Sequence, residues 1–99
     1  MFVTIKPSTI KGKKYTAIFY DNDKKKVKTT HFGSAGMSDY TIHKDKERRQ
    51  RYLDRHRKNE NWDNYMSAGS LSRYILWNLP TFNSSYSAYR KRFNLKKLS

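Results

Sequence analysis

The sequence contains no cysteine, few acidic residues and no long apolar run. Without cysteine, the chain can form no disulfide framework, no thiolate zinc site and no cysteine nucleophile. Its longest apolar run, Tyr74–Trp77, is far shorter than the ~20 residues that a membrane-spanning helix needs. The first residues, Met1–Lys6, lead straight into polar sequence, which argues against a signal peptide. We therefore expect a soluble protein that is made in the cytosol, enters no membrane and is not secreted.

Basic residues outnumber acidic ones by 22 to 8, so the formal net charge of the 99-residue chain is +14. Such a surplus repels itself, and an anionic partner is the usual reason for it. Aromatic residues make up 15% of the chain, which a disordered basic tail would lack. A chain of this length has room for one hydrophobic core. The sequence therefore predicts a single folded basic domain over residues 1–99 that binds a polyanion.

The excess charge lies at the two ends of the sequence. Residues 1–34 carry eight basic and two acidic residues, and residues 65–99 carry six basic and no acidic residues, a balance of +6 in each segment. Residues 35–64 carry eight basic and six acidic residues, a balance of only +2. We therefore expect the two ends to supply the field that attracts an anion at long range.

Residues 1–32 are expected to form a β meander of about three strands. Their segments are rich in β-branched and aromatic residues, Pro7 ends the first of them, and Asp21–Asp23 is typical of a turn. In the third segment Lys26 and Lys28 share one face, because side chains alternate along a strand. The meander is therefore expected to carry one lysine-lined face.

The helical part, residues 39–94, is expected to begin with a long helix from about His43 to Lys58. Asp39 or Thr41 can cap this helix, because short oxygen-bearing side chains accept hydrogen bonds from free backbone N–H groups. Two acid–base pairs at i,i+4 spacing follow along it, Asp45 with Arg49 and Glu47 with Arg51. These pairs are expected to offset part of the charge of the helix.

Two further helices are expected after the long one. Ser70 can cap a short helix that Pro80 ends, and Ser84 or Ser85 can cap the last. The last helix carries an apolar stripe at i, i+3 and i+7, made of Tyr86, Tyr89 and Phe93. This stripe packs into the core or, where one chain cannot cover it, forms a homodimer interface. With a basic tail over residues 95–99, the pattern predicts an α+β domain, an N-terminal antiparallel sheet of about three strands followed by about three helices.

Basic residues interleaved with aromatic ones are typical of nucleic-acid binding. Lys and Arg release the counterions condensed on DNA or RNA, and planar groups can stack on bases. On the long helix, Lys44, Arg48, Arg51 and Arg55 recur at spacings of 4, 3 and 4, which places them on one face. The full set of candidate contacts is Lys24, Lys25, Lys26, Lys28, Lys44, Arg48, Arg51, Arg55, Arg73, Arg90, Lys91 and Arg92. It predicts sequence-tolerant binding of nucleic acid, double-stranded DNA first, through backbone phosphates, by a protein that is no enzyme and uses no metal or cofactor.

Two alternatives stay open. The first is a structural or interaction protein whose charge meets acidic protein surfaces or RNA. The second is a metal-dependent nuclease built on Asp39, His43 and His56, since residues four apart can share one helical face. The chain has no HExxH motif and no Asp-x-Asp pair, which counts against the nuclease.

Several blocks of the sequence resemble one family. They are His31–Gly33, Asp39–Thr41, His43–Asp45, Arg49, Tyr52, Arg55–His56, Glu60–Trp62 and Ala68–Trp77. Together they resemble small basic proteins of unassigned function encoded by large nucleocytoplasmic DNA viruses of amoebae and algae. The resemblance spans about residues 25–78, its most specific part is Gly69–Trp77, and it brings no enzymatic motif. It implies a protein of the virion and of the viral factory in the host-cell cytoplasm, which packages or compacts the genome or, as the alternative, serves virion structure or host interaction.

Overall fold

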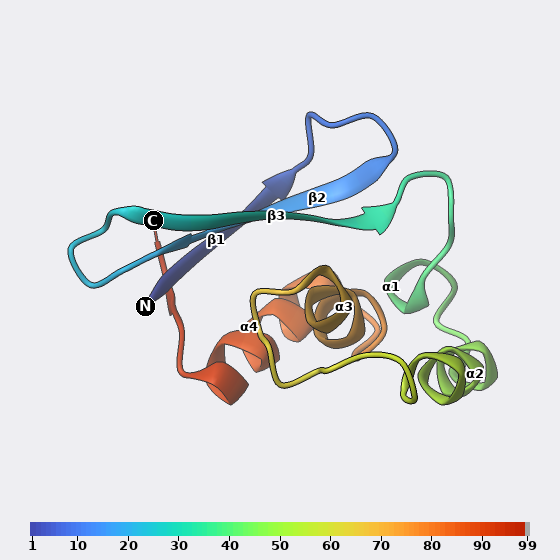
Figure 1. The fold of residues 1–99 in the computed structure, drawn as a ribbon. Coiled ribbons are helices and arrows are strands. Elements are labelled where there is room, and N and C mark those ends of the chain that lie inside the picture. Colours follow the sequence, from blue (N-terminus) through green and yellow to red (C-terminus); the bar gives the residue numbers. More distant parts are fainter. Residues whose placement is uncertain (99) are drawn as a thin grey trace.

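The computed structural model describes residues 1–98 and shows a sheet with helices packed against one of its faces (Figure 1). The strands are β1 (Phe2–Pro7), β2 (Lys13–Tyr20), β3 (Lys26–Ser34) and β4 (Lys96–Lys97). The helices are α1 (Tyr40–His43), α2 (Lys46–His56), α3 (Ala68–Leu71), the π-helical turn η1 (Ser72–Leu76) and α4 (Phe82–Phe93). The predicted α+β class, with N-terminal strands followed by helices, is confirmed.

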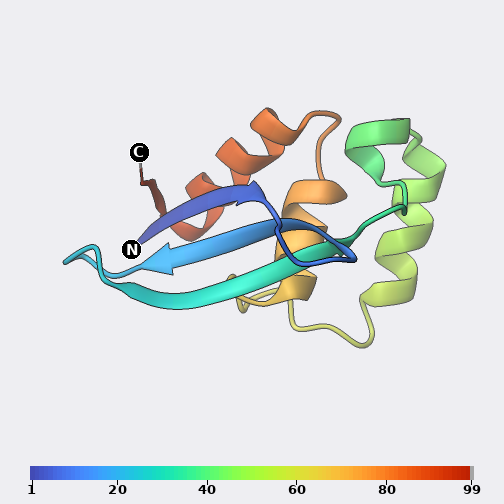
Figure 2. The same ribbon diagram turned by 90° about the horizontal axis from the view of Figure 1, so that it is seen from above.

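Strands β1, β2 and β3 form the expected antiparallel meander, and the sheet order is β3-β2-β1-β4. The turn between β2 and β3 lies where the sequence predicts it. There the Asp21 carboxylate accepts the backbone N–H groups of Asp23 and Lys25, each at 2.9 Å. Viewed from above, the sheet lies over α3 and η1, while α4 runs along one side of it and α2 stands beyond one end (Figure 2).

Strand β4 is an addition that the sequence pattern does not reveal. It runs parallel to β1 at the edge of the sheet opposite β3. Leu95 is buried in the core, and the backbone N–H of Lys96 donates to the carbonyl oxygen of Met1 at 3.1 Å. Part of the predicted basic tail, residues 95–99, is therefore a strand, while Ser99 lies outside the described residues.

The prediction that Lys26 and Lys28 share one face of the meander is wrong. Lys26 stands opposite Tyr20 and Lys28 opposite Phe19, so the two lysines project to opposite faces of the sheet, because the pairing is irregular at this point. Lys28 stands directly opposite Phe19 in the register, and Phe19 is fully buried between the sheet and the helical layer. Opposite residues of an antiparallel pair project to the same side, so Lys28 points to the helical side of the sheet. Thr30 follows on that side and donates to the carbonyl oxygen of Met66 at 2.7 Å. Lys28 is exposed near the start of β3, and Thr30 is buried.

Two helices lie in the region of the expected long helix. Lys44 adopts a left-handed backbone conformation, with φ of 55°, and this ends α1. Asp39 caps α1 by accepting the N–H of Thr41, whereas Asp45 caps α2 by accepting the N–H of Glu47. The helix predicted from about His43 to Lys58 is therefore present as α2, but its predicted start and cap are wrong, because Asp39 begins the separate helix α1 and Asp45 caps α2.

The caps of the later helices also differ from those predicted. Ser67, not Ser70, caps α3, because Ser70 is fully buried and donates to the carbonyl oxygen of Asn61. Thr81 caps α4 by accepting the N–H of Ser84 at 3.2 Å. The helix starts therefore lie three to four residues before the positions read from the sequence.

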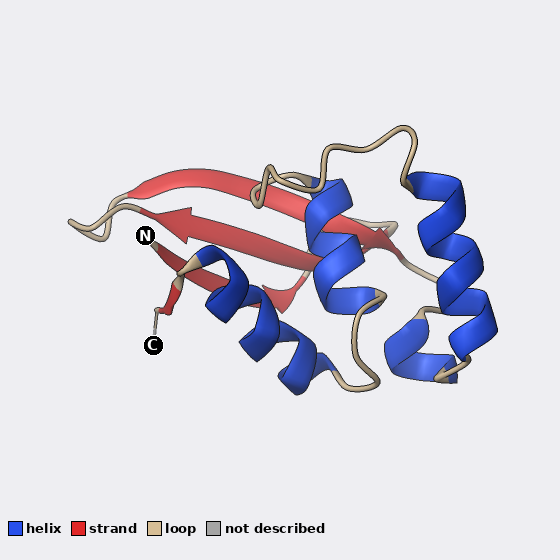
Figure 3. Cartoon of the chain, turned by 90° about the horizontal axis from the view of Figure 1, so that it is seen from below, coloured by secondary structure: helices blue, strands red, loops and turns tan. Residues whose placement is uncertain are grey.

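The apolar stripe of α4 packs into the chain's own core. Tyr89 is fully buried, and its hydroxyl donates to the carbonyl oxygen of Tyr65. The Tyr86 hydroxyl donates to the carbonyl oxygen of Val3 at 3.1 Å, so it ties α4 to β1. Figure 3 shows α4 beside η1 beneath the sheet. Two residues of the stripe are thus buried within the chain's own core, and Phe93 packs against that core while partly exposed.

Candidate nucleic-acid interface

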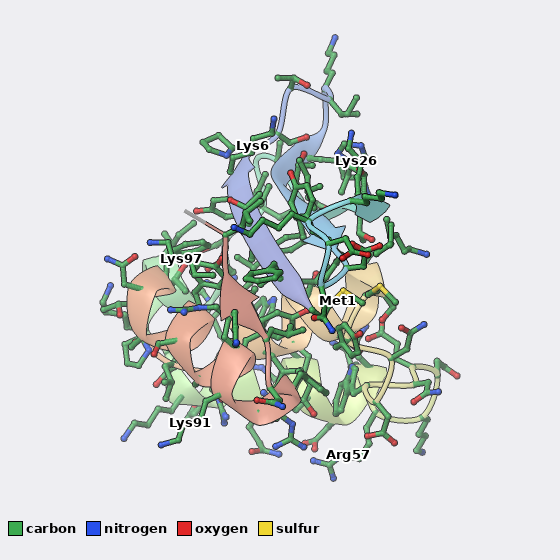
Figure 4. The ribbon with its side chains drawn as sticks, turned by 90° about the vertical axis from the view of Figure 1, so that its left-hand side faces the viewer. Met1, Lys6, Lys26, Arg57, Lys91 and Lys97 are labelled. Atoms are coloured by element: carbon green, nitrogen blue, oxygen red, sulfur yellow. The ribbon has the colours of Figure 1, made fainter. Side chains whose placement is uncertain are left out.

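Four segments meet at one end of the molecule: the start of β1, the β2–β3 turn, the last turn of α4 and β4 (Figures 1 and 2). The Met1 nitrogen donates to Asn22 Oδ1 at 2.9 Å, which joins the chain start to the turn. The pairing of Phe2 with Lys96 joins it to β4. Figure 4 looks onto this end and labels Met1, Lys26, Lys91 and Lys97 there. We call it the basic end; its cations are Lys24, Lys25, Lys26, Lys28, Arg90, Lys91, Arg92, Lys96 and Lys97.

The charge of the basic end is almost uncompensated. Its only acidic residues are Asp21 and Asp23, both in the β2–β3 turn, and the Asp21 carboxylate is occupied by backbone N–H groups. Within residues 1–98, the one ion pair of a Lys or Arg with an acidic side chain is Lys14–Asp39, which lies elsewhere. Eight of the nine cations are exposed, and Arg90 is half-buried.

Aromatic rings position three of these cations. The Lys24 Nζ lies 5.8 Å from the centre of the Phe2 ring, and the backbone of Lys24 is in the left-handed conformation within the β2–β3 turn. The Arg90 guanidinium lies 4.7 Å from the ring centre of Tyr86, and that of Arg92 lies 4.7 Å from the ring centre of Tyr74. Such cation–π contacts limit the freedom of the side chains while leaving their charge intact.

The basic residues of α2 form a separate group at the opposite end of the molecule (Figures 1 and 3). Arg48, Arg51 and Arg55 are exposed on this helix, and we call them the α2 patch. Lys44 does not belong to it, because it lies in the break before α2 and its Nζ donates to the carbonyl oxygen of Thr41. The expected face of four cations therefore has three.

The acid–base pairs expected along this helix are absent among the described residues. Asp45 and Glu47 make no ion pair with Arg49 or Arg51, since Asp45 caps the helix with its carboxylate. The Arg49 Nε instead donates to the carbonyl oxygen of Asn78 at 3.0 Å. The α2 patch is thus less neutralised than the sequence predicted.

Arg73 is not part of either group. Its guanidinium lies 5.3 Å from the ring centre of Trp62 and 5.0 Å from that of Tyr74, within the helical layer. Burial, and next the charge of Arg49, lower the pKa of Arg73 below its ordinary value. The structure therefore places Arg73 in packing between aromatic rings, where it shares the Tyr74 ring with Arg92 of the basic end.

The three candidate nuclease residues are held by other partners. The Asp39 carboxylate is buried and binds Lys14 and Thr41. The His43 Nδ1 accepts the backbone N–H of Asp45, and burial lowers the pKa of His43. His56 lies against the carboxylate of Glu60 at 3.2 Å. Among residues 1–98, no group of three or more His, Asp or Glu side chains is placed to hold a metal ion.

Comparison with known proteins places the chain in a family. A family model matches residues 3–56, just over half of the chain. The chain belongs to DUF5754, a family of unknown function. No curated protein and no solved structure matches it. None of the helices in the described part of the chain is long and apolar enough to cross a membrane.

The region matched by the family covers only part of the basic end. It includes the meander, α1 and α2, and hence the cations of the β2–β3 turn. The cations of α4 and β4 lie beyond it. Among them Lys96 and Lys97 were missing from the candidate contacts, although the surplus of charge after residue 65 was a signal for them.

Proposed function

We propose that this protein binds nucleic acid, double-stranded DNA first, through backbone phosphates and with little regard to sequence. The observation that supports it is the basic end, where segments far apart in the sequence bring nine Lys or Arg residues and two acids to one end of the molecule. Phosphates lining a duplex offer such a surface a row of anions, and each neutralised phosphate releases condensed counterions.

The types of cation favour phosphate contacts over reading of bases. Seven of the nine are lysines, which act as mobile point charges. The two arginines, which could read guanine with a bidentate contact, stack on rings of their own chain instead. Contacts of this kind position a protein on a duplex and carry no sequence information.

We propose that this binding serves to package the genome. Tolerance of sequence suits a protein that must coat a whole genome, and the resemblance of residues 25–78 to proteins of large DNA viruses points the same way. The proposed location is accordingly the virion and the viral factory in the host-cell cytoplasm.

A salt titration tests the proposal. The affinity for one short duplex is measured by fluorescence anisotropy at several salt concentrations. If six to eight phosphates are neutralised, the slope of log K against log salt is about −5 to −7. A scrambled duplex of equal length should bind nearly as well.

Two results would overturn the proposal. One is a slope shallower than about −2, which would mean that few phosphates are contacted. The other is a preference of ~10³ for one sequence, which would require direct reading of base edges. Parallel titrations with duplex RNA and heparin show whether the partner is DNA, RNA or any polyanion.

A further inference from the structure

The α2 patch gives the molecule a second basic surface. Arg48, Arg51 and Arg55 follow each other at spacings of three and four, so they lie on one face of α2. All three are exposed, and none makes an ion pair with Asp or Glu. Around them, residues 44–58 carry eight basic and three acidic residues, a local balance of +5.

The two basic surfaces are far apart. The molecule measures 42 × 28 × 25 Å along its principal axes. In Figures 1, 2 and 3, α2 stands at one end of the molecule, and the termini with the β2–β3 turn stand at the other. Charges separated by more than the Debye length of about 10 Å at 0.1 M salt are largely screened from each other. A duplex held at the basic end therefore leaves the field of the α2 patch almost unchanged.

The path between the two surfaces is packed. Tyr52 of α2 stacks on Trp77, with ring centres 4.3 Å apart and planes at 3°. η1, which precedes Trp77, contacts α4, and Ile75 of η1 and Tyr89 of α4 belong to the same hydrophobic core. The α2 patch is thus fixed relative to the basic end.

We propose that one chain bridges two nucleic-acid duplexes, one at the basic end and one at the α2 patch. The inference rests on the proposed function and adds to it a bivalent mode of binding. It explains how one small domain can draw separate duplexes, or distant parts of one duplex, together. The basic end, with nine cations, is the stronger site, and the α2 patch is the weaker one.

The test measures bridging and simple binding separately. One short duplex is fixed to beads through biotin, a second carries a fluorophore, and the fluorescence retained on the beads is measured as protein is added. Anisotropy with the second duplex alone gives the affinity for one duplex. Wild-type protein should bind one duplex and retain the second on the beads.

Two matched variants each remove three charges. They are Arg48→Gln/Arg51→Gln/Arg55→Gln in the α2 patch and Arg90→Gln/Lys91→Gln/Arg92→Gln at the basic end. The α2 variant should lose affinity for one duplex by about threefold or less, because the stronger site is kept, while retention on the beads falls at least tenfold. The basic-end variant should lose affinity for one duplex and also retention of the second duplex on the beads. An equal mixture of the two should not restore retention, because no chain in it has two intact sites.

Three outcomes would overturn bridging by a single chain. If the α2 variant still retains the second duplex, copies of the chain associate with each other instead. If the mixture restores retention, the chains assemble on DNA. If wild-type protein binds one duplex and retains no second one, bridging fails and the proposed function stands. Absence of any duplex binding would refute both. Circular dichroism confirms that each variant is folded.

Discussion

Reversing the charge of the basic end should weaken duplex binding far more than the same reversal on α2. The two variants are Arg90→Glu/Lys91→Glu/Arg92→Glu and Arg48→Glu/Arg51→Glu/Arg55→Glu. Each changes the net charge by six, from +14 to +8, so total charge cannot account for a difference. The basic end holds nine basic and two acidic side chains, and the first variant reduces this local balance from +7 to +1.

The magnitude follows from counterion release. Each lost phosphate contact reduces the magnitude of the slope of log K against log salt by about 0.9. At 0.1 M salt, where the logarithm of the concentration is −1, this lowers log K by about 0.9. Lys91 and Arg92 are exposed and Arg90 is half-buried, so two to three contacts are lost. The expected loss is therefore about 60- to 500-fold for the basic-end variant. The α2 variant keeps the stronger site and should lose less than about tenfold.

The assay is fluorescence anisotropy with one duplex at 0.1 M salt, with circular dichroism as the folding control. Because the Arg90 guanidinium lies on the Tyr86 ring, a second basic-end variant uses exposed lysines only, Lys91→Glu/Lys96→Glu/Lys97→Glu. It should behave like the first. A larger loss for the folded α2 variant than for both basic-end variants would refute our placement of the main site.

Three further predictions concern the fold and the nuclease alternative. Gly33→Ala should lower the free energy of unfolding by about 1–3 kcal/mol, because the φ of Gly33 is +78° and a Cβ there would lie 2.9 Å from Leu76 Cδ1. The control is Gly12→Ala, which is also at positive φ but has open space around it, so it should cost less in urea unfolding. Equal losses of stability in the two variants would contradict the packing argument. Burial lowers the pKa of His43, so as the pH falls the unfolded chain binds the proton before the folded one does, and the stability of the fold should fall below pH ~6.5. This fall, measured as the urea midpoint, should be smaller in His43→Gln. Identical pH profiles of the wild type and His43→Gln would contradict the role of His43. Supercoiled plasmid with Mg²⁺ or Mn²⁺ should stay intact, and nicking that disappears in His43→Ala would revive the nuclease.

The sequence by itself determined the class of fold and the presence of the meander. Alternation of β-branched and aromatic residues, Pro7 and the turn at Asp21–Asp23 are local signals, and local signals survive in the folded chain. Helix boundaries were less predictable. Several residues near each helix start could serve as caps, and burial decided among them. Ser70, for example, is buried in the core, and Ser67 caps α3 instead.

The sequence also determined that the surplus of charge lies toward its two ends, because that is a property of composition. Only the tertiary structure decided that these two ends of the chain lie together at one end of the molecule. Parallel pairing of β4 with β1, and the bond from the Tyr86 hydroxyl to Val3, bring the last residues against the first. Nothing in the two-residue strand Lys96–Lys97 signals this partner, because backbone hydrogen bonds form it and carry no side-chain pattern. The basic end is therefore a product of long-range pairing, whereas the α2 patch, built within one helix, could be read from spacing alone.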